Sequence, residues 1–166
     1  MRTSSAVILA LAAAMALAGP AAAQQSEPNR YHGSGYAIYG MGACQHGVMN
    51  VSFGVGGEGF VWRGLTLGGD AGYYRFVERG GSPIGVATVN VGYNFADRKR
   101  PGRFDPFVNV GLVGLAFTTG AATPAGAFGG GVNYWFSRHF GLRTEGRVTG
   151  VSGEAIAMFR VGLSFR

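Results

Sequence analysis

Apolar and polar residues alternate with a period of two along much of the chain, which is the pattern of β-strands with two different faces. The segment from Ile84 to Phe95 shows this alternation most clearly. Its apolar side chains share one parity and its small or polar side chains share the other: Ala87, Val89, Val91, Tyr93 and Phe95 against Thr88, Asn90, Gly92 and Asn94. Because successive side chains of a strand point to opposite sides, the segment predicts a strand with one apolar and one polar face.

Related patterns recur between glycine-rich or polar links and together predict eight antiparallel strands. The predicted strands are residues 35–44, 49–62, 65–76, 84–95, 106–117, 127–136, 140–149 and 154–166. The orientation of 106–117 stays open because it is apolar on both parities apart from Asn109, and glycines leave the orientation of 35–44 open as well. An even number of antiparallel strands can close into a barrel that has no unpaired edge.

The hairpin formed by 127–136 and 140–149 raises the question of which face is enclosed. In its second arm, three charged residues share one parity and the opposite parity is mostly apolar: Arg143, Glu145 and Arg147 against Phe140, Leu142 and Val148. A soluble sheet would bury the apolar side. A transmembrane barrel instead turns the apolar side toward lipid and encloses the polar side.

The first residues of the chain favour the membrane arrangement. Arg2 precedes an uncharged apolar run from Ala6 to Gly19, and Pro20 and three alanines follow before Gln24. This order is typical of a secretory signal peptide, and the run is shorter than the roughly 20 residues of a transmembrane helix. We therefore expect a signal peptide at 1–23, a short periplasmic lead-in at 24–34 and an outer-membrane barrel at 35–166.

Aromatic residues recur near the predicted strand ends, next to the links. They are Phe60, Trp62, Tyr73, Tyr74, Tyr93, Phe95 and the run Tyr134 to Phe136. Transmembrane barrels carry girdles of such residues on the outer surface at both membrane interfaces. We expect these side chains to form such a girdle.

Composition agrees with a strand-rich domain and narrows the possible partners. The 31 glycines disfavour helix, while 47% hydrophobic and 13% aromatic residues argue against a disordered glycine-rich chain. The net charge of +6 is spread along the chain without a basic helix or a stacking motif, so nucleic acid is not an expected partner. The basic run Arg98-Lys99-Arg100 with Arg103 predicts a solvated link, or else a contact with anionic lipid headgroups or lipopolysaccharide phosphates.

Two motifs carry a resemblance to a known family. The segment GVNYWFSRHFGLRTEGR, residues 131–147, resembles the penultimate hairpin of the small eight-stranded outer-membrane barrels of the OmpA/OmpX-like superfamily. Residues 160–165 resemble the C-terminal signal by which such proteins contact the outer-membrane assembly machinery, here through Arg160, Gly162 and Phe165, although Arg166 follows the aromatic residue. The resemblance implies an all-β, eight-stranded, antiparallel up-and-down transmembrane β-barrel in the outer membrane, and implies little about activity.

The charged residues of the inward parity predict a network inside the barrel. The residues are Glu58, Asp70, Arg143, Glu145, Arg147 and Arg160. An eight-stranded barrel is just wide enough for side chains to fill, and enclosed charges must be paired. We expect a structural ion-pair network that plugs the lumen; the alternative is a gated pore or a ligand site.

Residues with catalytic potential do not form a convincing constellation. Ser137 and His139 lie in a predicted turn in the order Ser-x-His, whereas lipid deacylases of this class have His-x-Ser, and Glu145 lies six residues farther along a strand. His32 and His46 are isolated, so we expect no metal or cofactor, and Cys44 is the single cysteine.

The expected function is therefore that of a monomeric, non-catalytic barrel with a structural or surface-interaction role, whose partners are outer-membrane lipid and lipopolysaccharide. Two alternatives remain open. One is a lipid-modifying outer-membrane enzyme, and the other is a secreted soluble barrel that binds a small apolar ligand inside.

Overall fold

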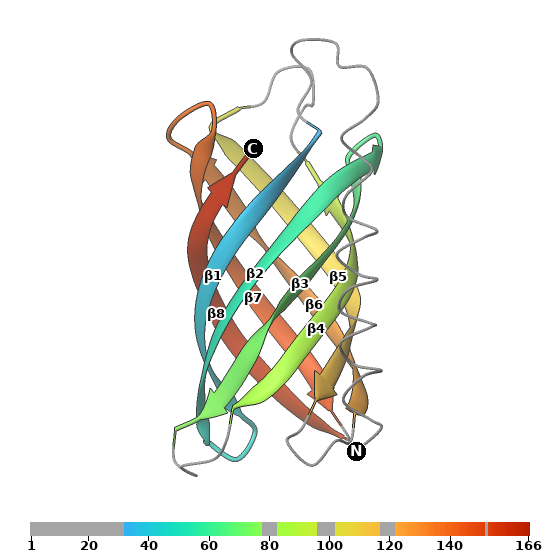
Figure 1. Cartoon of the computed structure of the whole chain (residues 1–166), viewed down its shortest axis with the longest axis vertical. Helices are drawn as coiled ribbons and strands as arrows, with labels where there is room; N and C mark the ends of the chain where they lie inside the picture. The colour runs from blue at the N-terminus through green and yellow to red at the C-terminus, as the bar shows by residue number, and fades with distance from the viewer. Residues whose placement is uncertain (1–31, 78–82, 96–101, 117–121, 152) are drawn as a thin grey trace, which may run out of the picture.

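Eight antiparallel strands pair in chain order, and the last strand pairs with the first to close a barrel (Figure 1). The strands of this computed structural model are β1 (Gly33–Cys44), β2 (Met49–Trp62), β3 (Leu65–Phe76), β4 (Ile84–Asn94), β5 (Phe104–Ala116), β6 (Ala122–Trp135), β7 (Phe140–Val151) and β8 (Glu154–Phe165). The structure describes residues 32–77, 83–95, 102–116, 122–151 and 153–166. The predicted up-and-down barrel is confirmed. In the described part of the chain, no helix is long and apolar enough to cross a membrane.

The barrel has two ends, which we name after the first and last residues of β1. The Gly33 end, uppermost in Figure 1, carries the C-terminus of the chain and the connections 63–64, 95–103 and 136–139. The Cys44 end carries the connections 45–48, 77–83, 117–121 and 152–153. All of these connections are short, so most of the described chain belongs to the barrel wall.

Polar side chains point into the barrel and apolar side chains point outward. On β4, Thr88 is 4% exposed whereas its neighbour Val89 is 56% exposed, and the alternation continues to the end of the strand. The same arrangement holds for the charged hairpin of β6 and β7, where Arg143 and Arg147 are buried and Phe140 and Val148 are exposed. The face assignment predicted for a transmembrane barrel is therefore confirmed.

The structure resolves the two strands whose orientation the sequence left open. On β5, Phe107 and Asn109 face the interior while Val108 and Val110 face outward. On β1, the interior receives Tyr36 and Ile38. Pairing with neighbours decides both cases, because β5 must match the registers of β4 and β6 at the same time.

Two expectations about strand ends and aromatic residues are wrong. Strand β6 begins at Ala122, five residues earlier than predicted, because the small residues of the expected loop pair with β5. Tyr74 and Trp135, expected in the outer girdle, are buried inside the barrel because each occupies the inward parity of its strand. Trp62, Tyr93, Phe95 and Phe136 lie on the outer surface as expected.

The turn between β2 and β3 has the two-residue form that the sequence predicts at Arg63-Gly64. Both residues have positive φ, 36° and 91°, which is the pattern of a type I′ hairpin turn. The amide of Asn94 donates a 2.8 Å hydrogen bond to the carbonyl oxygen of Gly64 and ties this turn to β4.

A close approach between β6 and β7 gives a test of the packing in the wall. A Cβ atom on Gly131 would collide with the backbone carbonyl of Thr144, whereas a Cβ on Gly126 of the same strand would meet nothing within 4 Å. We expect Gly131→Ala to lower the free energy of unfolding by about 1–3 kcal/mol and Gly126→Ala to change it by less than about 0.5 kcal/mol. Urea unfolding of the detergent-folded proteins measures both, and equal stabilities would contradict the register of β6 and β7.

Candidate functional site

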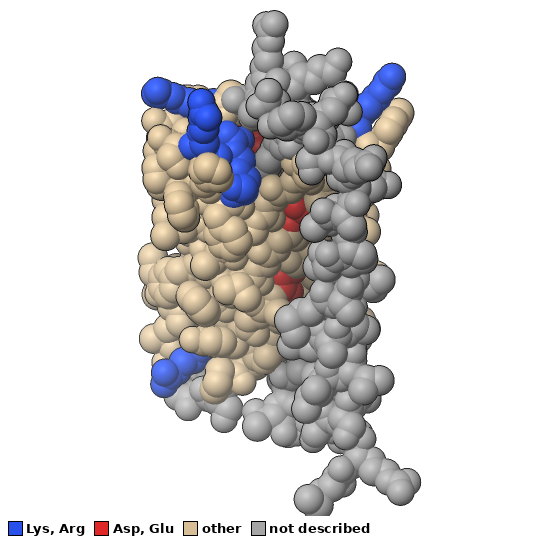
Figure 2. Space-filling model, turned by 45° about the horizontal axis from the view of Figure 1, so that its top comes forward, with Lys and Arg blue, Asp and Glu red and all other residues tan. Residues whose placement is uncertain are grey.

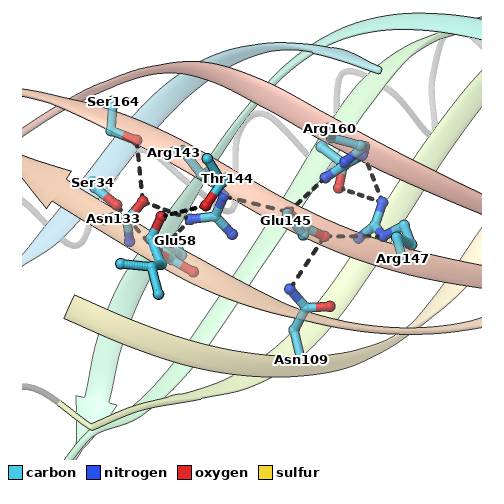
Figure 3. Close-up of polar contacts among 12 residues, drawn as sticks. Ser34, Glu58, Asn109, Asn133, Arg143, Thr144, Glu145, Arg147, Arg160 and Ser164 are labelled. Atoms are coloured by element: carbon cyan, nitrogen blue, oxygen red, sulfur yellow. Dashed lines mark hydrogen bonds and ion pairs between the residues drawn. The ribbon is translucent and has the colours of Figure 1, made fainter. Parts of the chain in front are cut away.

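The interior holds all six charged residues singled out in the sequence, and their side chains meet in one network of ion pairs. Figure 3 labels all of them except Asp70. Glu145 of β7, 0% exposed, lies at its centre. One carboxylate oxygen lies 3.0 Å from Nη2 of Arg160 and 3.3 Å from Nε of Arg143, and the other oxygen lies 3.3 Å from Nε of Arg147. Three guanidinium groups therefore share one carboxylate.

Two further carboxylates complete the charge balance. Glu58 of β2 lies 3.1 Å from Nη1 of Arg143. Asp70 of β3 lies 3.1 Å from Nη1 of Arg147 and 3.4 Å from Nη1 of Arg160. The three arginines and three carboxylates of the network sum to zero. This neutrality matters because a buried charge left without its partner is strongly destabilising.

Aromatic rings flank one of the arginines. The Cζ atom of Arg143 lies 4.3 Å from the ring centroid of Tyr36 and 3.9 Å from that of Phe107, so β1 and β5 each contribute one ring. Desolvated cation–π contacts of this kind add to the ion pairs and hold the guanidinium plane. Sequence reasoning missed both rings because the orientations of these two strands were open.

Neutral polar side chains add further hydrogen bonds to the network. The Asn133 oxygen accepts hydrogen bonds from Arg143 at 3.4 Å and from the Ser164 hydroxyl at 3.2 Å. The Ser34 hydroxyl donates to Glu58 at 3.3 Å, and the Asn109 amide donates to Glu145 at 3.5 Å. These residues were not singled out in the sequence, although each is a polar residue on the inward parity of its strand.

An apolar cluster fills the interior toward the Cys44 end. It consists of Tyr74, Val86, Val113, Leu115, Ala125, Ala127, Ile156 and Met158. Beside Asp70 and Arg160 lies a small cavity of about 10 Å³. A space of that size holds about one water molecule. The interior is thus charged in the middle and apolar at one end, with no room there for a larger ligand.

The structure does not bring together Ser137, His139 and Glu145, the residues weighed above as a possible hydrolase site. The Ser137 hydroxyl oxygen accepts hydrogen bonds from the backbone amides of Phe140 at 2.9 Å and His139 at 3.3 Å, as in a turn that is stabilised by its own serine. Glu145 lies inside the barrel and is paired with the arginines. Ser137 and His139 are exposed at the Gly33 end, and no hydrogen bond joins their side chains among the described contacts.

His46 and Arg103, weighed above as possible metal-binding and lipid-binding residues, lie at the rims of the barrel. His46 is exposed at the Cys44 end, with Nδ1 3.7 Å from Glu154. No cluster of three or more His, Cys, Asp or Glu side chains suited to a metal ion occurs within the described ranges. Arg103 is exposed at the Gly33 end, and Arg98-Lys99-Arg100 lies outside the described residues.

Comparisons with known proteins bear on the fold. No family model and no curated protein sequence matches the chain. The N-terminal β-barrel domain of Pseudomonas aeruginosa OprF superposes with a TM-score of 0.60 at 18% identity, over 82% of this chain and 98% of that one. Neisserial surface protein A gives 0.59 at 12% identity, over 81% and 95%. The Pseudomonas aeruginosa outer membrane protein OprG gives 0.57 at 8% identity, over 82% and 96%.

The chain has the fold of the small outer-membrane β-barrels. The resemblance carried by residues 131–147 is thereby confirmed at the level of fold. Such low identities carry no activity across, since one fold hosts many functions. Any activity must therefore be argued from this chain's own residues.

The central position of Glu145 allows a test of how much the ion-pair network stabilises the barrel. Glu145→Gln leaves three buried arginines against two carboxylates, so we expect the free energy of unfolding to fall by about 3–5 kcal/mol. Urea unfolding of the detergent-folded protein measures the change. The exposed carboxylate Glu154 supplies the control, and Glu154→Gln is expected to change the same free energy by less than about 0.5 kcal/mol.

A double variant separates charge balance from packing. Combining Glu145→Gln with Arg160→Gln restores equal numbers of buried positive and negative groups. We expect this protein to be more stable than the single Glu145→Gln variant, because two coupled sites in one network are not additive. A double variant that loses the sum of both single effects would show that the network does not act as a unit.

Proposed function

We propose that the chain is a non-catalytic, monomeric integral protein of the outer membrane, with a structural or surface-interaction role. The observation that carries the proposal is the distribution of charge across the wall. On the outward faces of the described strands the charged side chain is Arg75, which lies within two residues of the Cys44 end. Glu154, at the first position of β8, is exposed at the same rim but lies on the inward parity of its strand. The rest of the outer wall is uncharged and rich in exposed apolar side chains, which suits a hydrocarbon surrounding.

The filled interior supports a structural role over transport. Ion pairs occupy the middle of the lumen and an apolar cluster occupies the part toward the Cys44 end. Solute passage would require the separation of buried ion pairs as well as the displacement of the apolar cluster. Such a barrel anchors its rims at the two membrane surfaces and carries no open channel.

Segments near the two ends of the sequence are proposed to direct export and membrane insertion. We propose that residues 1–23 act as a secretory signal peptide and that the residues from 24 up to β1 form a periplasmic lead-in, which places the Gly33 end on the periplasmic side. The lead-in ends two residues earlier than the expected 24–34, because β1 begins at Gly33. The residues Arg160, Gly162 and Phe165 are proposed to contact the assembly machinery. Arg160 is buried in the finished barrel, so its recognition belongs to the stage before closure.

The two alternative functions find less support in the interior and at the rims. A ligand-binding soluble barrel needs an internal cavity, and the space beside Asp70 and Arg160 holds about one water molecule. A lipid-modifying enzyme needs an activated nucleophile, and the Ser137 oxygen is already engaged with backbone amides. Outer-membrane lipid and lipopolysaccharide remain the proposed partners.

The outward face of β4 provides the test of membrane insertion. Val89 lies in the middle of this strand, and an arginine facing lipid there costs roughly 2–4 kcal/mol, against about 0–1 kcal/mol near the interface. We expect Val89→Arg to reduce the amount of heat-modifiable protein in the outer-membrane fraction several-fold. Phe95→Arg, at the rim of the same strand, is the matched control and is expected to have little effect.

The same fractionation decides between membrane and soluble barrels. Wild-type protein is expected in the outer-membrane fraction, with different gel mobility before and after boiling. Recovery of wild-type and Val89→Arg protein in equal amounts from the soluble fraction would overturn the proposal, because a hydrated outer wall tolerates a surface arginine.

A further inference from the structure

Arginine side chains surround the Gly33 end of the barrel. Arg63 lies in the turn between β2 and β3, Arg103 directly precedes β5, Arg138 lies in the turn between β6 and β7, and Arg166 follows β8. The first three are exposed and Arg166 is half-buried. Each hairpin connection of this end thus contributes one described arginine, and the end of the last strand contributes a fourth. In Figure 2, which brings this end forward, blue side chains gather at the rim above a mostly tan wall.

Among the described residues, no exposed carboxylate side chain balances these arginines at the Gly33 end. Asp105 is the described acidic residue nearest this rim in the strands, and it is 1% exposed inside the barrel. The exposed acidic residue Glu154 lies at the opposite end, beside His46. The charge of the barrel surface is therefore strongly asymmetric, with a cationic rim at the Gly33 end.

A belt of exposed aromatic residues lies directly next to this cationic rim. Its members are Trp62, Tyr93, Phe95, Phe104, Phe136, Phe140 and Phe165, which come from five strands and two connections. At the Cys44 end small residues hold several of the last outward positions, among them Ala43, Gly85, Gly114 and Ala155, whereas Met49 and Arg75 hold those of β2 and β3. Aromatic belts mark the level of the headgroups in a membrane, so the arginines lie where lipid phosphates lie.

Local contacts hold several of these arginines at the rim. The Cζ atom of Arg63 lies 5.3 Å from the ring centroid of the exposed Trp62. The Cζ atom of Arg166 lies 4.2 Å from the ring of Trp135, and its Nε donates a 2.9 Å hydrogen bond to the carbonyl oxygen of Arg138. Guanidinium groups stack on aromatic rings and still offer paired N–H donors, which match the oxygens of a phosphate.

We propose that the Gly33 end binds the phosphate groups of anionic phospholipids through Arg63, Arg103 and Arg138, and so collects these lipids around the barrel. The even spacing of the arginines favours lipid over a single macromolecular partner. A protein or polymer that docks on one side needs a one-sided patch, whereas lipid headgroups surround the whole circumference. The inference rests on the proposed insertion into the membrane and adds the lipid class and the rim that binds it.

Trp62 makes the binding measurable at the site itself. The full chain has two tryptophans, and Trp135 is 2% exposed inside the barrel, so lipid-borne quenchers reach Trp62 alone. The protein is reconstituted into vesicles that contain brominated phosphatidylglycerol or brominated phosphatidylcholine in a common lipid background. Quenching of tryptophan fluorescence then gives the relative binding constant of each lipid next to Arg63.

We expect phosphatidylglycerol to bind next to Trp62 roughly three- to fivefold more tightly than phosphatidylcholine, because the attraction between one arginine and an anionic headgroup is of this size. Arg63→Gln is expected to reduce this preference to about one. The matched control is Arg75→Gln, which removes an exposed arginine near the Cys44 end and is expected to leave the preference unchanged. High salt is expected to weaken the wild-type preference.

A second measurement covers the whole rim. Native mass spectrometry counts the phosphatidylglycerol molecules that remain on the detergent-extracted protein, and we expect Arg63→Gln/Arg103→Gln/Arg138→Gln to retain fewer of them than Arg75→Gln. Both variants should show the heat-modifiable mobility of a closed barrel, so that loss of lipid is not loss of fold.

The outcomes separate this inference from the proposed function. Equal quenching by both brominated lipids in wild-type protein would overturn the lipid preference and leave membrane insertion intact. No quenching of Trp62 by either lipid would contradict insertion itself. Binding of soluble polyphosphate through the same arginines, without a preference among lipids, would overturn the inference in favour of a soluble polyanion.

Discussion

Three guanidinium groups converge on the carboxylate of Glu145 in the middle of the barrel, and the rest of the interior is arranged around them. Glu58 and Asp70 bring the charge to zero, and Tyr36 and Phe107 enclose the guanidinium of Arg143. Arg143, Glu145 and Arg147 share β7, and the other members come from five further strands. The network therefore bonds β1, β2, β3, β5, β7 and β8 across the lumen. Such an arrangement is stable only as a complete set, since removal of one member leaves a buried charge unpaired.

The enclosed charges and the apolar wall are two consequences of the same alternation. Because side chains of a strand alternate between its faces, polar residues placed inside leave apolar ones outside. The closed barrel pairs the backbone N–H and C=O groups of each strand with those of its neighbours, so that none is left unpaired toward the hydrocarbon. What remains for contact with water or lipid headgroups is the pair of rims, and here the rims differ. One has arginines beside an aromatic belt, whereas the described residues of the other include many small outward side chains and one exposed arginine.

The strength of the sequence pattern decided how well each element could be predicted. On β4, β7 and β8 the alternation is strong, and the side-chain orientations follow from it. The start of β6 was missed because Ala122 to Gly126 have the composition of a loop, and their pairing with β5 has no local signal. Tyr74 and Trp135 were assigned to the girdle by residue type, although the parity of their strands places them inside.

The sequence by itself determined the number of strands, the closed antiparallel barrel and most of the charged residues that face inward. It missed Asp105, which lies before the predicted start of its strand and is buried inside the barrel. These features follow from a period of two, which most of the strands carry locally. The tertiary structure decided which inward residues meet. Arg143 and Glu58 lie 85 residues apart, and Arg147 and Asp70 lie 77 apart. Their contact depends on barrel closure and on the register of all eight strands, which bring distant segments across the lumen and which no single segment encodes.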